Sequence, residues 1–244
     1  MKKLLALMLA ALMLVSLIGC GKNDTETPDG EEGNVTANNN IYNGVLKYDV
    51  NQYGDLEITG FIPQSNEPAD VVIPAEIEGR DVTGIGEEAF KACVTLRSVT
   101  FEGDLEYISA GAFYGCTALK SITLPATVKD IKENAFQNCT GLETVALSAN
   151  LEEIGLAAFW GCEKLTGVTL PTKLETIDGG AFYGCSALTS IVIPESVKTI
   201  GDTAFYGCSA LTTASYYDTA TVGESVFGQC SADIAITVIP TDAE

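Results

Sequence analysis

The chain has 244 residues and a formal net charge of −20, from 33 acidic and 13 basic side chains. A surface of this charge repels nucleic acid and anionic lipid, whereas it attracts cations or basic partners, or keeps an exported protein in solution. The sequence has no histidine, which excludes Ser-His and Cys-His nucleophile pairs and removes the commonest metal ligand.

The first element in the chain is an export signal, expected over residues 1–19. Lys2 and Lys3 precede an apolar stretch from Leu4 to Ile18 in which only Ser16 is polar. The stretch is shorter than the roughly 20 residues needed to span a bilayer, and a small residue follows it, as in cleaved signal peptides. The alternative is a short transmembrane anchor.

The end of this signal, Leu17-Ile18-Gly19-Cys20, resembles the lipobox of bacterial lipoproteins. In that family the signal is cut before the cysteine, whose sulfur and new amino group are then acylated. The resemblance implies that Cys20 becomes a lipidated N-terminus and that the protein is exported and lipid-anchored to the outside of the cell envelope. Several acyl chains give stable anchoring, whereas one chain is marginal.

Residues 20–40 form the next segment, which follows the lipobox with almost no large apolar side chain. Such a composition cannot bury enough surface to offset its ordering entropy, so we predict a flexible tether. Residues 41–70 then read as two strands that form a small N-terminal β cap.

A repeat of 22–23 residues occupies the rest of the chain, over residues 71–240. The phenylalanines keep this period at Phe90, Phe113, Phe136, Phe159, Phe182, Phe205 and Phe227. Cysteine, leucine and isoleucine columns run in the same register, as in Cys139, Leu142 and Ile131. Such self-similarity is the signature of a solenoid of about seven units, in which each coil buries its apolar face against its neighbours.

Within the unit from Leu119 to Cys139, Ile122 and Leu124 alternate with polar residues, as in a half-buried strand. Pro125 then ends the strand, because proline cannot donate to a ladder. The spacing around Ala135-Phe136 is closer and suits a short helical turn. Equivalent residues of stacked coils should lie about 4.8 Å apart.

The pattern LxxIxLPxxVxxIxxxAFxxC resembles the BspA-like subclass of bacterial leucine-rich repeats over about residues 71–240. The resemblance implies a right-handed leucine-rich-repeat solenoid, with one parallel β-sheet on its concave face and short helical turns and loops on its convex face. The last unit departs from the pattern, with Val226 where alanine is usual, as expected of a terminal repeat. The segment ADIAITVIP after it supplies a candidate final strand.

The solenoid contains seven cysteines, which suggest nucleophiles, metal ligands, disulfides or core residues. Their spacing of 22 or 23 residues does not match a zinc cluster, and an odd number cannot all pair within one chain. A bridge between adjacent coils fits the Cα distance but not the Cβ distance. We therefore interpret them as buried free thiols that pack as small apolar groups, and we expect no metal site, no catalytic residue and no cofactor.

Two surface columns are candidate binding sites. One is an aromatic stripe at the position that follows each phenylalanine. Its rings either stack on the sugar rings of a glycan or on a partner protein, or they only pack against the solenoid. It consists of Tyr114, Trp160, Tyr183 and Tyr206. The other is a hydroxylated face on the predicted concave sheet, where serine and threonine bind a ligand or simply suit exposed strands. It consists of Ser98, Thr100, Ser121, Thr123, Thr144, Thr169, Ser190, Thr213 and Ser215.

These features favour a non-enzymatic cell-surface lipoprotein. The family resemblance implies adhesion or protein–protein recognition, with a host, neighbouring-cell or envelope protein as ligand. We expect the protein to contact the membrane through its lipid only, and we expect no binding of nucleic acid. The alternative is a glycan-binding lipoprotein that uses the aromatic stripe. An enzyme is disfavoured, because the repeat distributes residues evenly whereas catalysis needs one uneven constellation.

Overall fold

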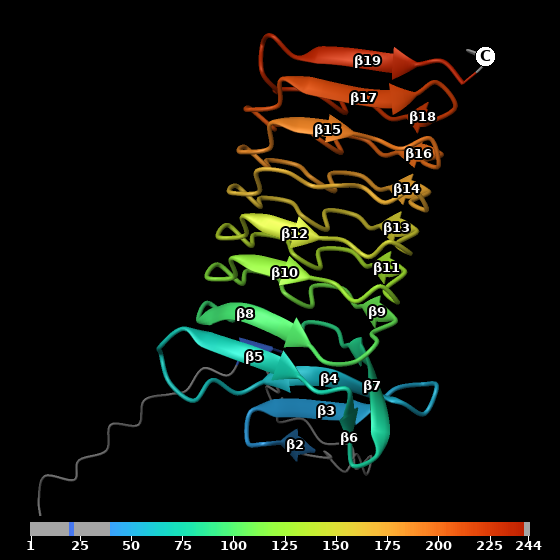
Figure 1. Cartoon of the computed structure of the whole chain (residues 1–244). Coiled ribbons are helices and arrows are strands. Elements are labelled where there is room, and N and C mark those ends of the chain that lie inside the picture. The colour runs from blue at the N-terminus through green and yellow to red at the C-terminus, as the bar shows by residue number, and fades with distance from the viewer. Residues whose placement is uncertain (1–19, 22–39, 242–244) are drawn as a thin grey trace, which may run out of the picture.

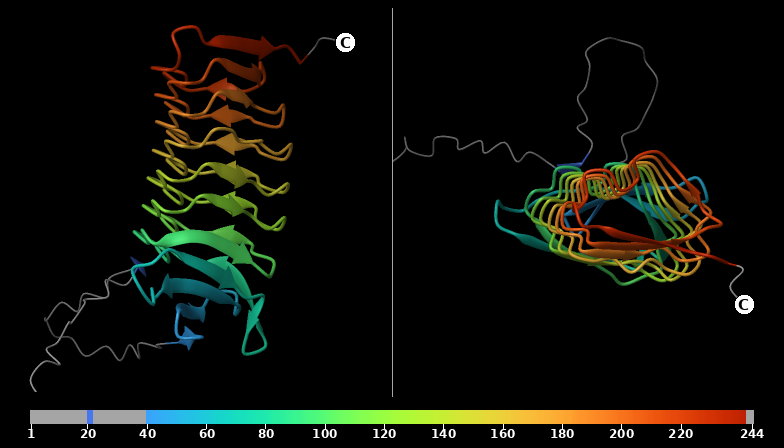
Figure 2. Two further views of the ribbon diagram at one scale, coloured as in Figure 1. Left: turned by 60° about the vertical axis from the view of Figure 1, so that its left-hand side comes forward. Right: turned by 90° about the horizontal axis from the view of Figure 1, so that it is seen from above.

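The computed structural model describes residues 20–21 and 40–241 of the chain. The repeat region forms a β-solenoid, a column of stacked coils with the β cap at one end and the last strand at the other (Figure 1). Seen along the column, successive coils nearly superimpose (Figure 2). The period read from the sequence is therefore the length of one coil.

One side of the coils carries a parallel ladder of short strands that contains the isoleucine column. It pairs Ile85 with Ile108, Ile131 with Ile154 and so on along the column. The strands of this side are β7 (Arg80–Ile85), β9 (Tyr107–Ile108), β11 (Asp130–Ile131), β13 (Glu153–Ile154), β14 (Thr176–Ile177), β16 (Thr199–Ile200) and β18 (Thr221–Val222). Each of these strands pairs in parallel with the next.

A second side carries the strands that alternate between core and solvent, and it is divided into two sheets. The first sheet contains β5 (Ala69–Ile73), β8 (Leu96–Phe101), β10 (Ser121–Thr123) and β12 (Thr144–Ala146). The second contains β15 (Ser190–Val192), β17 (Thr213–Tyr217) and β19 (Ala235–Ile239). Strands thus lie on two sides of the coil, so the expectation of one parallel sheet is wrong.

The segments around the phenylalanines are turns, and residues 40–241 contain no helix. The described residues therefore include no helix that is long and apolar enough to cross a bilayer. In each coil the residues two before and two after the phenylalanine have positive φ, between 53° and 74°. The intervening amides alternate in direction, so that Phe90 N–H donates to Ala112 O in the next coil at 2.7 Å. The predicted helical turn is absent because every second amide bonds to the next coil, and only the amides between them bond three residues back along the chain, as Lys91 N–H does to Glu88 O.

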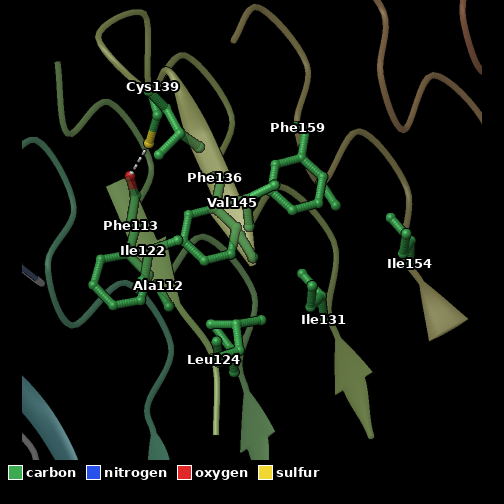
Figure 3. Packing of buried hydrophobic residues seen from close by; sticks show 14 of the residues in the cluster. Ala112, Phe113, Ile122, Leu124, Ile131, Phe136, Cys139, Val145, Ile154 and Phe159 are labelled. Carbon is green, nitrogen blue, oxygen red and sulfur yellow. Dashed lines mark hydrogen bonds between the residues drawn. The ribbon is translucent and has the colours of Figure 1, made fainter. Parts of the chain in front are cut away.

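The core is a set of columns running along the solenoid axis. The phenylalanine rings from Phe90 to Phe205 are fully buried and stack in near-parallel pairs, with ring centroids 5.1 or 5.2 Å apart. Figure 3 shows three of these rings beside Ile131, Ile154 and Cys139. The offset between stacked rings is a favourable aromatic geometry, so each coil fixes the position of the next.

The first coil is covered by antiparallel strands, β2 (Ile41–Tyr42), β3 (Leu46–Val50) and β4 (Leu56–Phe61). β4 pairs in parallel with β7, and Phe61 continues the aromatic stack onto Phe90. A further antiparallel pair joins β6 (Glu76–Ile77) to β7. These strands cover the apolar face that a first coil would otherwise expose.

Tyr107 ties this cap to the first coils. Its hydroxyl donates to Glu57 Oε2 at 3.0 Å and accepts from Asn51 Nδ2 at 3.2 Å. Burial, reinforced by the neighbouring carboxylates, raises the pKa of Tyr107 to about 12. The hydroxyl therefore stays a donor across the physiological pH range.

Candidate functional site

The hydroxylated face predicted from sequence lies on the second side of the coils. Parallel pairing places Ser98, Ser121 and Thr144 in one column, and Ser190 and Thr213 in its continuation. All nine predicted side chains are exposed except Ser98 and Ser215, which are half-buried. The structure therefore brings the predicted residues together on one surface, which we call the hydroxyl face.

Ion pairs border the hydroxyl face. Asp70 on β5 accepts hydrogen bonds from Arg97 and, at 2.6 Å, from the hydroxyl of Ser98. The bond from Arg97, followed by the bond from Ser98, lowers the pKa of Asp70 to about 2. Lys120 and Glu143 form a second exposed pair with 3.6 Å between Nζ and Oε1, so in both pairs opposite charges offset each other beside the hydroxyl groups.

The hydroxyl face is interrupted in its middle, at residues 166–170. Gly167 stands where other coils have an outward serine or threonine, and it makes only an isolated bridge to Thr144. No ladder joins residues 168–170 to β15, so this coil separates the two sheets. Glycine weakens a strand because it contributes no side chain to pack and more entropy to lose.

A recess of about 960 Å³ opens at this interruption. Its apolar lining comes from Val168, Leu170, Val192 and Tyr217. Hydroxyl groups such as that of Thr169 and one carboxylate, Glu195, also line the recess. Val192 is 68% exposed, more than most large apolar side chains of the described residues. An apolar centre with a hydroxylated surround is the usual anatomy of a protein interface. The signal of this site in the sequence is Gly167, a glycine within a strand pattern.

The aromatic stripe packs against itself. Trp160 and Tyr183 stack with ring centroids 3.9 Å apart, and Tyr183 stacks on Tyr206 at 5.1 Å. A Cβ added at Gly228 would lie 2.6 Å from the Tyr206 ring, and one at Gly180 would lie 3.0 Å from the Trp160 ring. These contacts leave no space for a sugar ring between the stacked faces, so the geometry favours the packing interpretation. Tyr114 lies apart from this stack, with Lys91 Nζ 5.8 Å from its ring centroid.

The cysteine column is part of the core, and each thiol has a bond that the sequence did not reveal. Cys139 Sγ donates to Phe113 O in the preceding coil at 3.1 Å (Figure 3). The same bond recurs at 3.0–3.3 Å from Cys116, Cys162, Cys185, Cys208 and Cys230. The free-thiol interpretation is confirmed for these six residues.

Cys93, at the head of the column, is disulfide-bonded, so the free-thiol interpretation is wrong for this residue. Its bond does not run along the column, because Cys116 in the next coil is free. The described residues contain no group of three or more histidine, cysteine, aspartate or glutamate side chains that could hold a metal ion.

The predicted signal at 1–19 and most of the tether at 20–40 lie outside the described residues. The backbone of β1 (Cys20–Gly21) pairs antiparallel with Phe61 and Gly60 of β4. The backbone of the predicted lipid site thus lies beside the cap. Acylation of the Cys20 side chain stays a prediction.

Comparison with known proteins agrees with this architecture. The model of the BspA type leucine rich repeat region matches residues 75–185 and 152–242, in six copies. The chain belongs to the BspA-type leucine-rich repeat family. No curated protein matches it.

Two solved structures are similar to this BspA-type chain. The leucine-rich repeat protein of T. pallidum is 29% identical with a TM-score of 0.73, over 80% of this chain and 90% of that one. A leucine-rich repeat protein from Bacteroides ovatus is 24% identical with a TM-score of 0.68, over 81% of this chain and 58% of that one. Leucine-rich repeats of this kind are generally protein-interaction modules without catalytic activity.

Proposed function

We propose that the chain is a lipid-anchored cell-surface adhesion module, which is not an enzyme and binds a protein through its hydroxyl face. The observation that carries this proposal is the recess around Val192 within an exposed face rich in hydroxyl groups. Binding energy concentrates where an apolar group of the partner fills such a recess and surrounding contacts exclude water. Because the chain has a net charge of −20, it repels an acidic partner in general, and a face on which hydroxyl groups predominate reduces that repulsion.

A photo-crosslinking residue introduced at Val192 in intact cells tests this face. We expect it to give a discrete adduct with one protein. Val94 is the matched control, because it is another exposed valine, 58% against 68%, and lies on the loop before β8 rather than on the face. Equal adducts from both positions, or an adduct from Val94 only, would contradict the assignment.

The aromatic stripe does not support the glycan alternative, because its ring faces cover one another. A protein ligand, from a host, a neighbouring cell or the envelope, therefore remains the proposed partner. Trp160→Ala is expected to reduce stability without a specific effect on the adduct from Val192. Loss of the adduct in this variant while the protein remains folded would argue for a role of the stripe in binding.

The lipid anchor rests on the lipobox-like sequence before Cys20. We expect the wild-type protein to incorporate labelled palmitate and Cys20→Ser not to, because no acyl chain is then attached. Label that persists in Cys20→Ser would exclude acylation at Cys20.

A further inference from the structure

The end of the solenoid opposite the cap leaves its core columns uncovered. Ile236 and Val238 on β19 continue the core positions of Ala214 and Tyr216 on β17. Ala214 is 3% exposed, whereas Ile236 and Val238 are 45% and 48% exposed. No coil lies over them in the described residues. The last coil therefore presents a cross-section of the apolar core to solvent, where solenoids usually have a polar cap.

The same end presents an unpaired strand edge. β19 pairs with β17 only, and Ala235 N–H and Ile239 C=O bond toward that side. Backbone groups alternate in direction along a strand, so the N–H and C=O groups of Ile236 and Val238 point away from β17. An exposed edge of apolar residues is a template for pairing with another strand.

A second copy of this chain fits that edge. When β19 meets its own copy antiparallel about a two-fold axis at Thr237, Ile236 of each copy lies opposite Val238 of the other. Residues opposite each other with outward N–H and C=O groups exchange both hydrogen bonds. The core-facing side chains of the two copies then also lie on one face and continue the columns of both solenoids.

Charge and capping support this occupant. β19 carries no ionisable side chain, in a chain of net charge −20, so the strands themselves meet without the like-charge repulsion that this net charge favours elsewhere. The opposite end is covered by the antiparallel strands β2, β3 and β4. Association through β19 therefore closes at two copies instead of extending into a fibre.

We propose that the protein forms a tail-to-tail dimer through antiparallel pairing of β19. Because β1 and the cap lie at the far end of each solenoid from β19 (Figure 1), the two cap ends are at opposite ends of the dimer. If the lipid anchor proposed above holds, the dimer links two facing membranes, so that one copy is the adhesion partner of another. The dimer itself does not depend on the anchor.

Carboxylates surround the contact and set its salt dependence. Asp218, Glu224 and Asp233 lie in the last coil, and no lysine or arginine accompanies them in residues 212–241. Two copies bring these like charges together at the rim. Association is therefore expected to strengthen as ionic strength rises, the opposite of a contact held by ion pairs.

Sedimentation velocity on the full chain in detergent, over a concentration series, tests the dimer. We expect a concentration-dependent dimer, and a Kd raised about 10-fold or more in Ile236→Lys/Val238→Lys, since like charges then face each other. The matched control is Val50→Lys/Val72→Lys, which adds the same charge at two similarly exposed residues far from β19. A monomer at all concentrations, equal effects of both variants, or larger oligomers would overturn the proposal.

Thr237→Cys provides a second measurement that does not depend on lysine substitutions. At the two-fold axis this residue forms a non-hydrogen-bonded pair with its copy, with Cα atoms about 4.5 Å apart, which suits a disulfide. Mild oxidation should give a covalent dimer from this variant and none from Thr172→Cys, an exposed control outside the last coil. Absence of the covalent dimer would exclude the register. Both measurements report on association of two copies, and neither uses Cys20 or the side chain of Val192, so failure here leaves the proposed function standing.

Discussion

At the scale of single residues, the cysteine column shows how one side chain serves both packing and hydrogen bonding. Each of the six free thiols donates to the carbonyl of a phenylalanine in the preceding coil, and all but Cys230 are buried. Burial raises the pKa of Cys162 and Cys185 well above the usual range, and it raises that of Cys208 to about 12. The thiolate is the reactive form, so the column is chemically inert for a structural reason.

Thiol labelling should therefore follow position in the column. At pH 8 we expect a maleimide to modify Cys230, which is only partly buried, well before Cys162 or Cys185. The rate should rise with pH, because raised pKa values leave little thiolate at neutral pH. Peptide mass analysis of the native protein after timed labelling measures the order. Equal rates at Cys230 and Cys162 would show that the last coils open together.

Backbone conformation makes a second residue-scale prediction, at the turns. Gly184 has φ +69°, and Gly167 does not have a left-handed φ, although a Cβ at either position would meet nothing within 4 Å. Gly184→Ala should destabilise the fold by about 1–2 kcal/mol, the cost of a Cβ in the left-handed region. Gly167→Ala is the matched control and should be neutral or stabilise by about 0.4–1 kcal/mol. Denaturant unfolding compares the two, and equal effects would contradict the conformational explanation.

At the scale of strands and turns, the sequence predicted structural features that recur in every coil. It did not predict features that occur in a single coil. Alternation at Ile122 and Leu124 correctly placed the strands of the second side. The two-residue strands around Ile131 and Ile154 were missed, since two residues are too short to show alternation. The turn was expected to be helical from its apolar spacing, and its bonds between coils cannot be read from one unit.

The hydroxyl face was predictable for the same reason, because serine and threonine recur at fixed positions in several coils. The recess was not, since it depends on the absence of a side chain at Gly167 and on the loss of pairing to β15. The exposed edge of β19 depends on pairing, since this strand pairs with β17 alone among the described residues. A missing side chain or a missing strand pairing in one coil is difficult to predict from a pattern averaged over several coils.

Restoring the missing side chain tests the origin of the recess. Gly167→Thr gives this coil the residue type found at Thr144 in the preceding coil and raises its strand propensity. We expect slower amide hydrogen exchange in residues 166–170 and 190–193, together with a weaker adduct from a crosslinker at Val192. Hydrogen exchange read by mass spectrometry measures the first effect. Unchanged exchange would mean that Gly167 is not what separates the two sheets.

At the scale of the whole molecule, stability comes from contacts between neighbouring coils. Every core column continues through the same period, and the phenylalanine stack joins the cap to the last coil. In such a solenoid the free energy of folding is close to a sum of coil and neighbour terms. The number of coils can then change as long as each remaining coil meets an equivalent neighbour.

Removing one full period should therefore leave a folded protein. Deleting residues 117–139 joins Cys116 to Thr140 and brings β8 against β12, which have the same register toward β10. We expect one cooperative thermal transition with a modestly lower Tm and an unchanged β-type circular dichroism spectrum. Deleting residues 120–139, three residues less than a period, is the control, because it moves every later column out of register. Equal behaviour of the two deletions would mean that coil stacking does not hold the fold, whereas folding of the first alone would show that the period itself is the unit of stability.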